Sequence, residues 1–165
     1  MKQVFISCVT LMVLCSVSFA SQPVQLFIIA HNKNANVVRY EAEIGLDGKL
    51  DPAVPVKAYW LMLNEDGRRK ELTVLDKKAY GFSCEFDNKA GVCNLTIRSF
   101  KKRGITIAAE KNQVTAQMLI GGRQSVLKKV YIDAMHALVI PKVRYIELFG
   151  KDAQTGKQNY EKIQF

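Results

Sequence analysis

The chain has 165 residues, of which 48% are hydrophobic, and its 24 Lys and Arg against 15 Asp and Glu give a net charge of +9. This is the length of one domain, enough to remove roughly two-thirds of the unfolded surface from water. The basic residues stand in short pairs and triplets along the whole chain, which favours a solvated surface, and no nucleic-acid partner is expected. An anionic envelope component, such as a phosphate-bearing lipid or an acidic polymer, is the alternative.

Residues 1–20 have the features of a cleavable signal peptide. Lys2 is followed by an apolar run to Phe19, and Ser18-Phe19-Ala20 places small residues at the positions that a signal peptidase reads. The apolar run is short for a membrane span of about 20 residues, and no basic cluster follows it. We therefore expect residues 21–165 to form a single exported β-rich domain, periplasmic or secreted, with no transmembrane segment. Loss of Lys2 lowers its net charge to +8.

A repeat of two in hydrophobicity predicts strands through most of the mature chain. The first predicted strand, residues 26–30, is a continuous apolar run that indicates burial. In the second, residues 38–44, Arg39, Glu41 and Glu43 alternate with apolar residues, which predicts a half-exposed strand whose carboxylates face water. The third has apolar residues on both faces, which predicts a central position in the sheet. The predicted strands cover residues 26–30, 38–44, 56–63, 81–86, 92–97, 105–109, 114–120, 126–135, 143–149 and 159–165.

Residues 71–80 break this pattern. Leu72, Leu75 and Ala79 stand at helical spacing before Gly81, which predicts one short helix. About ten short strands with one helix indicate an all-β fold, mainly an antiparallel sandwich or barrel of about eight to ten strands. The sequence does not decide between the two.

Two cysteines, Cys84 and Cys93, remain after cleavage and are predicted to form a disulfide. Each lies in a predicted strand, and the turn 87–91 between them is rich in residues that tolerate unusual backbone angles. If the hairpin folds about Asn88-Lys89, the two cysteines face each other at bridging distance. A structural zinc site would need four ligands, and these cysteines have no nearby histidines.

Tyr59 and Trp60 are neighbours in the third strand and therefore point to opposite faces of the sheet. Packing in the core is the expected role of Trp60, with Ala58 and Met62 on the same face, because large aromatic side chains dominate small cores. Lining an apolar ligand cavity is the alternative.

Short segments in a characteristic order carry a resemblance along nearly the whole mature chain. They are Asn34-Ala35-Asn36 before a strand, Asp47-Gly48-Lys49, Pro55 to Trp60, Glu65-Asp66-Gly67, Ala79-Tyr80-Gly81, Val143 to Gly150, and Thr155-Gly156-Lys157. In these the chain resembles the family of exported bacterial proteins that share domain of unknown function 4833. The resemblance implies an envelope or secreted protein. It implies no activity and brings no functional residues.

The sequence gives little support for catalysis. The mature chain has two histidines, His31 and His136, and a histidine needs a positioned partner to act as a base. Asp133 would lie on the opposite face from His136 in an extended strand. No nucleophile elbow, phosphate loop, dinucleotide fingerprint or zinc-protease motif is present, and neither a cofactor nor a metal is expected.

A non-catalytic binding or interaction module of the bacterial envelope is the function that the sequence favours. An envelope enzyme of unrecognised type and a structural accessory protein are the alternatives. The candidate contacts for a small apolar ligand or a partner are His31, Asn34, Asn36, Tyr59, Trp60 and Tyr80.

The export signal gives a first testable prediction. The protein recovered from outside the cytoplasm should begin at Ser21, because cleavage is expected after Ala20. Intact-mass measurement of the exported protein checks this. A mass that retains residues 1–20, or that includes a lipid on Cys15, would contradict it.

Overall fold

The structure is a computed structural model that describes residues 23–110, 113–135 and 142–165. The predicted signal peptide, Cys15 and His136 lie outside these residues. Within them the chain forms one short helix and eleven strands. In chain order these are β1 (Val24–His31), β2 (Asn34–Ala42), β3 (Val56–Met62), β4 (Arg68–Glu71), α1 (Asp76–Ala79), β5 (Phe82–Asp87), β6 (Val92–Ile97), β7 (Ile105–Glu110), β8 (Gln113–Ile120), β9 (Arg123–Met135), β10 (Lys142–Asp152) and β11 (Gln158–Gln164).

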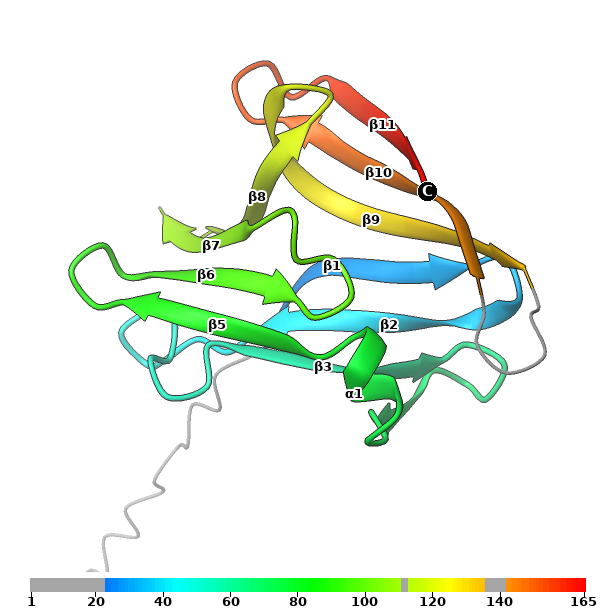
Figure 1. Ribbon diagram of the computed structural model, residues 1–165. Helices are drawn as coiled ribbons and strands as arrows, with labels where there is room; N and C mark the ends of the chain where they lie inside the picture. Colours follow the sequence, from blue (N-terminus) through cyan, green and yellow to red (C-terminus); the bar gives the residue numbers. More distant parts are fainter. Residues whose placement is uncertain (1–22, 111–112, 136–141) are drawn as a thin grey trace, which may run out of the picture.

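All of these strands belong to one sheet, which branches at β9 (Figure 1). Nine strands follow the order β4-β3-β2-β1-β9-β8-β7-β6-β5. The N-terminal part of β9 pairs with β8, and its C-terminal part pairs in parallel with β1, from Ile28 opposite Lys129 to His31 opposite Ile132. The other side of β9 pairs along its length with β10, which in turn pairs with β11. Every pairing other than that of β1 with β9 is antiparallel.

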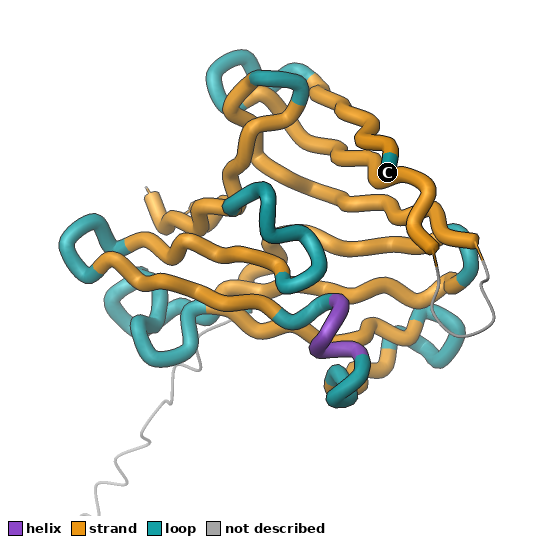
Figure 2. Tube along the Cα trace, in the orientation of Figure 1, coloured by secondary structure: helices purple, strands orange, loops and turns teal. Residues whose placement is uncertain are grey.

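The nine-stranded path curls into an open half-barrel (Figure 2). Its two arms approach each other across the core, where the rings of Tyr40 on β2 and Phe82 on β5 are 5.9 Å apart. Among the described strands no ladder joins the terminal strands β4 and β5. The predicted all-β class with one short helix is thus confirmed. The largest fully buried side chains are Tyr40, Phe27, Leu95, Ile107, Ile120, Leu127 and Leu148.

The prediction that Glu41 faces water is wrong. Only 1% of the Glu41 side chain is exposed, although it lies on the outer face of the sheet. Its carboxylate oxygens lie 2.8 Å from Arg39 Nε and 2.9 Å from Arg69 Nη2. The two guanidinium groups cover the carboxylate and neutralise it, which is the condition for burying a charge. Glu43 is half-buried and lies 3.1 Å from Lys57 Nζ.

The segment between β3 and β5 departs from the predicted single helix. Its first residues, Arg68–Glu71, form the exposed edge strand β4, which holds Arg69 beside Glu41. Charged side chains on such an edge oppose pairing with a second chain. The helix is only one turn, Asp76–Ala79, and Leu75 is 74% exposed where the sequence predicted a packed position.

The cysteine hairpin forms with a different register from the predicted one. Asp87 pairs with Val92, which shifts the turn by one residue, and Cys84 and Cys93 lie diagonally rather than directly opposite each other. Asp87 decides this register, because its carboxylate accepts hydrogen bonds from the amides of Lys89 and Ala90 and its carbonyl accepts one from Gly91. Gly91 adopts a φ of 66°, which glycine permits without strain. The two sulfurs still lie at disulfide distance, with Cα atoms 5.7 Å apart.

No helix within the described part of the chain is both long and apolar enough to cross a bilayer.

Replacing both Cys84 and Cys93 by Ser should lower the free energy of unfolding by about 2–3 kcal/mol, because the short loop regains its entropy in the unfolded chain. Denaturant titration of the double variant and the wild type measures the difference, and thiol titration of the unfolded, unreduced wild type should find no reactive thiol. Two reactive thiols would contradict the disulfide.

Candidate functional site

A pocket of about 520 Å³ opens at the end of the sheet where β1 ends at His31 and β9 ends at Met135. This end lies at the right of Figure 1. The parallel pairing of β1 with β9 brings their C-terminal ends together there, and α1 approaches from the other arm of the curled sheet. The apolar lining consists of Trp60, Ala79, Tyr80, Ile132, Ala134, Met135 and Val143, and the polar lining of His31, Asn32, Lys33, Asn34, Asp76 and Ser99.

Three rings form one wall of the pocket. His31, Trp60 and Tyr80 are all half-buried and come from β1, β3 and the residue after α1. The Tyr80 ring meets His31 edge-on at 5.3 Å and Trp60 edge-on at 5.4 Å, and the His31 and Trp60 rings are 6.0 Å apart. Edge-to-face contacts at these distances are favourable because the positive edge of one ring meets the negative face of the next. The wall is therefore fixed by its own contacts.

The buried side chain of Tyr40 connects this wall to the core. Its ring stacks on Phe27 with centroids 4.4 Å apart, and its hydroxyl donates a 2.5 Å hydrogen bond to the Tyr80 carbonyl. The next residue, Gly81, has no room for a side chain, because a Cβ atom there would lie 2.3 Å from the Lys77 carbonyl oxygen. The core thus fixes the backbone at the end of α1, and with it the position of the Tyr80 ring.

The start of α1 is closed by reciprocal hydrogen bonds of the capping-box type. The Asp76 carboxylate accepts from the amide and hydroxyl of Thr73 at 2.9 and 2.7 Å, and the Asp76 amide donates to Thr73 Oγ1 at 3.2 Å. Burial acts to raise the pKa of Asp76, but the Thr73 hydrogen bonds outweigh it and hold the pKa below its ordinary value. Asp76 is thus a charged, structurally engaged carboxylate at the pocket.

Asn32 holds the other side of the pocket together. Its side-chain amide donates to Asp133 Oδ2 at 3.3 Å and to the Ala134 carbonyl at 3.2 Å, and its side-chain oxygen accepts from the Ala134 amide at 3.2 Å. Asp133 also pairs with Arg144 on β10. These contacts join the β1–β2 turn to β9 and β10 at the point where the three elements meet.

The polar end of the pocket is the pair formed by His31 and Tyr80. The Tyr80 hydroxyl lies 2.8 Å from His31 Nε2, and His31 Nδ1 is buried without a hydrogen-bond partner among the described residues. Burial lowers the pKa of His31 from 6.5, and it raises the pKa of Tyr80, to which the nearby Asp76 charge adds. Both groups are neutral at pH 7.

The hydrogen bonds around the pocket give no sign of an activated nucleophile. Ser99 directs its hydroxyl to the Ala79 carbonyl at 2.6 Å, and His31 pairs with Tyr80 rather than with a serine or a carboxylate. Nucleophilic catalysis would need a base in contact with the hydroxyl. In the part of the chain that the structure describes, no three His, Cys, Asp or Glu side chains are grouped as a metal site requires.

The structure brings four of the six predicted contact residues together: His31, Asn34, Trp60 and Tyr80 line the pocket. Asn36 does not line it and instead accepts a 3.3 Å hydrogen bond from the Asn64 amide. Trp60 departs from its expected role, because it is half-buried at the pocket rather than enclosed in the core. Its ring contacts those of Tyr80 and His31, and it also lines the pocket.

Tyr59 lies on the other face of β3, as alternation predicts, and is buried there in a cluster of charges. Arg69 stacks on its ring with the guanidinium carbon 4.4 Å from the centroid. Burial raises the pKa of Tyr59 to about 12, and the neighbouring Glu41 carboxylate adds to the effect. Because Glu41 engages Arg39 and Arg69, this cluster attaches the edge strand β4 to β2 and β3 and is separate from the pocket.

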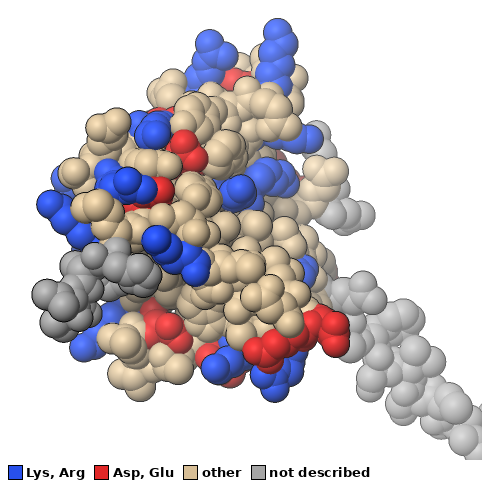
Figure 3. All heavy atoms as spheres, turned by 90° about the vertical axis from the view of Figure 1, so that its right-hand side faces the viewer, with Lys and Arg blue, Asp and Glu red and all other residues tan. Residues whose placement is uncertain are grey.

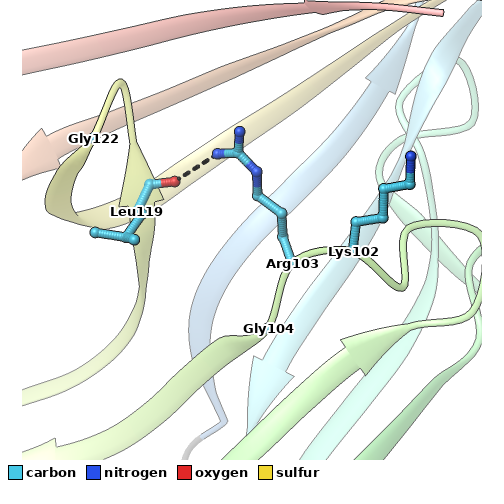
Figure 4. Close-up of a pocket in the computed structure, with 5 residues that line it drawn as sticks. All are labelled: Lys102, Arg103, Gly104, Leu119 and Gly122. Carbon is cyan, nitrogen blue, oxygen red and sulfur yellow. Dashed lines mark hydrogen bonds between the residues drawn. The ribbon is translucent and has the colours of Figure 1, made fainter.

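A second hollow, of about 360 Å³, lies beside Arg103 and Leu119 (Figure 4). Arg103 donates to the Leu119 carbonyl at 3.0 Å and forms two hydrogen bonds to the Glu161 carboxylate, at 2.8 and 2.5 Å. Glu161 also accepts from the Gly121 amide at 2.8 Å. The guanidinium group is therefore already used to join the β6–β7 loop, the β8–β9 turn and β11, and this hollow is a less suitable ligand site than the pocket.

Several pocket residues carried no signal in the sequence. In the sequence, Ile132, Met135 and Val143 have the pattern of ordinary strand residues, and Ser99 lies in a predicted loop, but all four line the pocket. Their position depends on which strands pair, since β9 and β10 reach the pocket through the branch of the sheet. Among the pocket residues that sequence reasoning missed, Asp76 had a recognisable local pattern, the Thr73-x-x-Asp76 spacing of a capping box.

The fold and the site define an all-β protein with an open, curled sheet and a lateral pocket walled by aromatic rings. The family model named Domain of unknown function (DUF4833) matches residues 27–162, and the chain belongs to this family. Comparisons with curated proteins and with solved structures gave no match.

The lowered pKa of His31 predicts a pH dependence of stability. The unfolded chain binds a proton near pH 6.5, whereas the folded protein binds it only at lower pH. Between these pH values the unfolded state holds more protons, so stability should fall as the pH is lowered below about 6.5. Urea unfolding of the wild type and of His31→Gln across this range measures the effect. The variant should show a shallower dependence, and equal slopes would contradict the prediction.

Proposed function

We propose that this protein is a non-catalytic binding module of the bacterial envelope, and that its pocket holds a small, mainly apolar molecule with one polar group. The observation that carries the proposal is the half-buried wall formed by His31, Trp60 and Tyr80. Large aromatic rings left partly uncovered at a pocket are costly to keep in water, and a ligand that covers them recovers this free energy.

The size and chemistry of the pocket define the ligand class. A volume of about 520 Å³ lies within the range of small-molecule sites, which are mostly apolar with a few placed polar groups. Trp60 and Tyr80 on one side and Ile132 and Val143 on the other provide apolar walls for a ring or an acyl chain. The neutral pair of Tyr80 and His31 can both donate and accept a hydrogen bond, which suits a hydroxyl or carbonyl group on the ligand.

Export is part of the proposal and has independent support. The signal pattern of residues 1–20 predicts passage out of the cytoplasm, and cysteines at disulfide distance are typical of proteins in oxidising compartments. In the periplasm or outside the cell, the pocket would meet envelope lipids, their fragments or apolar solutes.

The neutral apolar dye phenylnaphthylamine tests the binding function directly. Trp60 is the only tryptophan of the chain and lines the pocket, so a dye bound there should quench its emission strongly by energy transfer. We expect dye fluorescence to rise as Trp60 emission falls. Replacing Trp60 with Ala should weaken dye binding by about tenfold or more, because the largest ring of the wall is lost.

Leu61→Ala is the matched control. Leu61 is the next residue on β3 and lies on the opposite face of the sheet, so its loss should leave the dye affinity unchanged. Trp60→Ala should also lower the free energy of unfolding by less than the about 3–5 kcal/mol that is typical for loss of a fully buried aromatic side chain. A wild type that does not bind the dye, or equal losses in both variants, would overturn the proposal.

A further inference from the structure

Two strongly exposed apolar side chains stand beside the pocket. Val74 is 81% exposed and Leu75 is 74% exposed, and they directly precede the helix whose Asp76 and Ala79 line the pocket. Met135, which lines the pocket at the end of β9, is 45% exposed. The pocket therefore opens next to apolar surface that the fold itself does not cover.

The exposure of this tip is built into the fold. Leu72, two residues before Val74, is buried in the core, with 5% exposed, and anchors the segment. The reciprocal hydrogen bonds of Thr73 and Asp76 close the turn between them, so Val74 and Leu75 are held outward at its apex. The apex therefore presents two adjacent apolar side chains to solvent beside the pocket lining.

Lysines surround the tip and the pocket opening. Lys77 and Lys78 are exposed on α1, Lys33 is exposed on the pocket lining, and Lys142 is exposed at the start of β10. Within the described residues, none of the four lies within ion-pair distance of a carboxylate. The Asp76 carboxylate accepts hydrogen bonds from Thr73 and keeps its negative charge, so the lysines outnumber it at this end. On the face shown in Figure 3, Lys and Arg side chains are distributed around broad uncharged surface, with groups of Asp and Glu among them, the most prominent at the lower right.

We propose that this end of the protein docks on an anionic lipid surface, with Val74 and Leu75 inserted among the lipids and the lysines against their phosphate groups. Apolar side chains flanked by cations are the combination that binds anionic membranes at their interface. Docking in this way places the pocket opening at the membrane surface. This inference rests on the proposed function of the pocket. It identifies the ligand class as a membrane amphiphile, whose apolar part would lie in the pocket and whose headgroup would lie near the lysines.

Sedimentation of the mature protein with lipid vesicles tests the docking. Binding should be clear on phosphatidylcholine vesicles that contain about 30% phosphatidylglycerol, weak on phosphatidylcholine alone, and reduced by salt. The variant Val74→Ser with Leu75→Ser should bind about tenfold more weakly. Leu46→Ser is its matched control, because Leu46 is 84% exposed but follows the end of β2 opposite to the pocket, and this variant should bind like the wild type.

A second pair of variants tests the charges. Lys77→Gln with Lys78→Gln should lose most of the preference for anionic vesicles. Lys49→Gln with Lys89→Gln removes the same charge from exposed lysines that line a different hollow, and should keep the preference. No vesicle binding by the wild type, equal binding to both vesicle types, or equal losses in test and control variants would each overturn the docking proposal.

The dye experiment separates this inference from the proposed function. The Val74 and Leu75 variant should still bind phenylnaphthylamine in solution, and Trp60→Ala should still sediment with anionic vesicles. Dye binding without vesicle binding would leave the pocket standing and refute the docking. Vesicle binding without dye binding would refute the pocket function, and with it the assignment of a membrane amphiphile as the ligand.

Discussion

The pairing of β9 with three other strands is the constraint on which the rest of the structure depends. Its thirteen residues hydrogen-bond to β8 and β1 on one side and to β10 on the other. This sharing joins the two arms of the curled sheet and adds β10 and β11 as a branch. It also brings the C-terminal ends of β1 and β9 side by side, which creates the end of the sheet where the pocket lies. A proline in the second half of β9, which cannot donate to the ladder, would therefore disturb the pocket as well as the sheet.

The pocket wall is an extension of the core. Phe27 and Tyr40 stack in the interior, Tyr40 holds the backbone of Tyr80, and the ring of Tyr80 contacts His31 and Trp60. Through this series of contacts the stability of the core fixes the position of side chains that are only half-buried. A site held in this way is preorganised, so that little conformational entropy is lost when a ligand binds. That property suits a binding module whose ligand is recognised mainly by shape and apolar contact.

Charge is used in two different ways in this molecule. Where a carboxylate is buried, as Glu41 is, two arginines enclose it and attach the edge strand β4 to the sheet. Around the pocket the lysines are exposed and stand beside apolar side chains at the tip before α1. The first arrangement attaches an edge strand to the fold, whereas the second is the surface that we propose docks on an anionic membrane. The net positive charge of the chain does not distinguish the two arrangements, because paired arginines and exposed lysines contribute equally to it.

The sequence by itself determined the all-β class, the approximate positions of most strands and the cysteine hairpin, because strand periodicity and turn chemistry are local. It named His31, Asn34, Trp60 and Tyr80 among its candidate contacts, but it contained no information that they would meet at one pocket. It also placed Tyr59 and Trp60 on opposite faces, since alternation requires only the local backbone. The one-residue shift of the hairpin, the burial of Glu41 and the exposure of Trp60 and Leu75 could not be read in this way. The burial of Glu41 depends on Arg69, which β4 brings near from elsewhere in the chain, and the half-burial of Trp60 depends on the pocket that the curled sheet leaves beside its ring. The hairpin shift has a local cause, the hydrogen bonds that Asp87 accepts in the turn, which strand periodicity does not contain. The periodicity that revealed the strands contains no information about which of them would meet, and only the branching at β9 decided where the pocket would form.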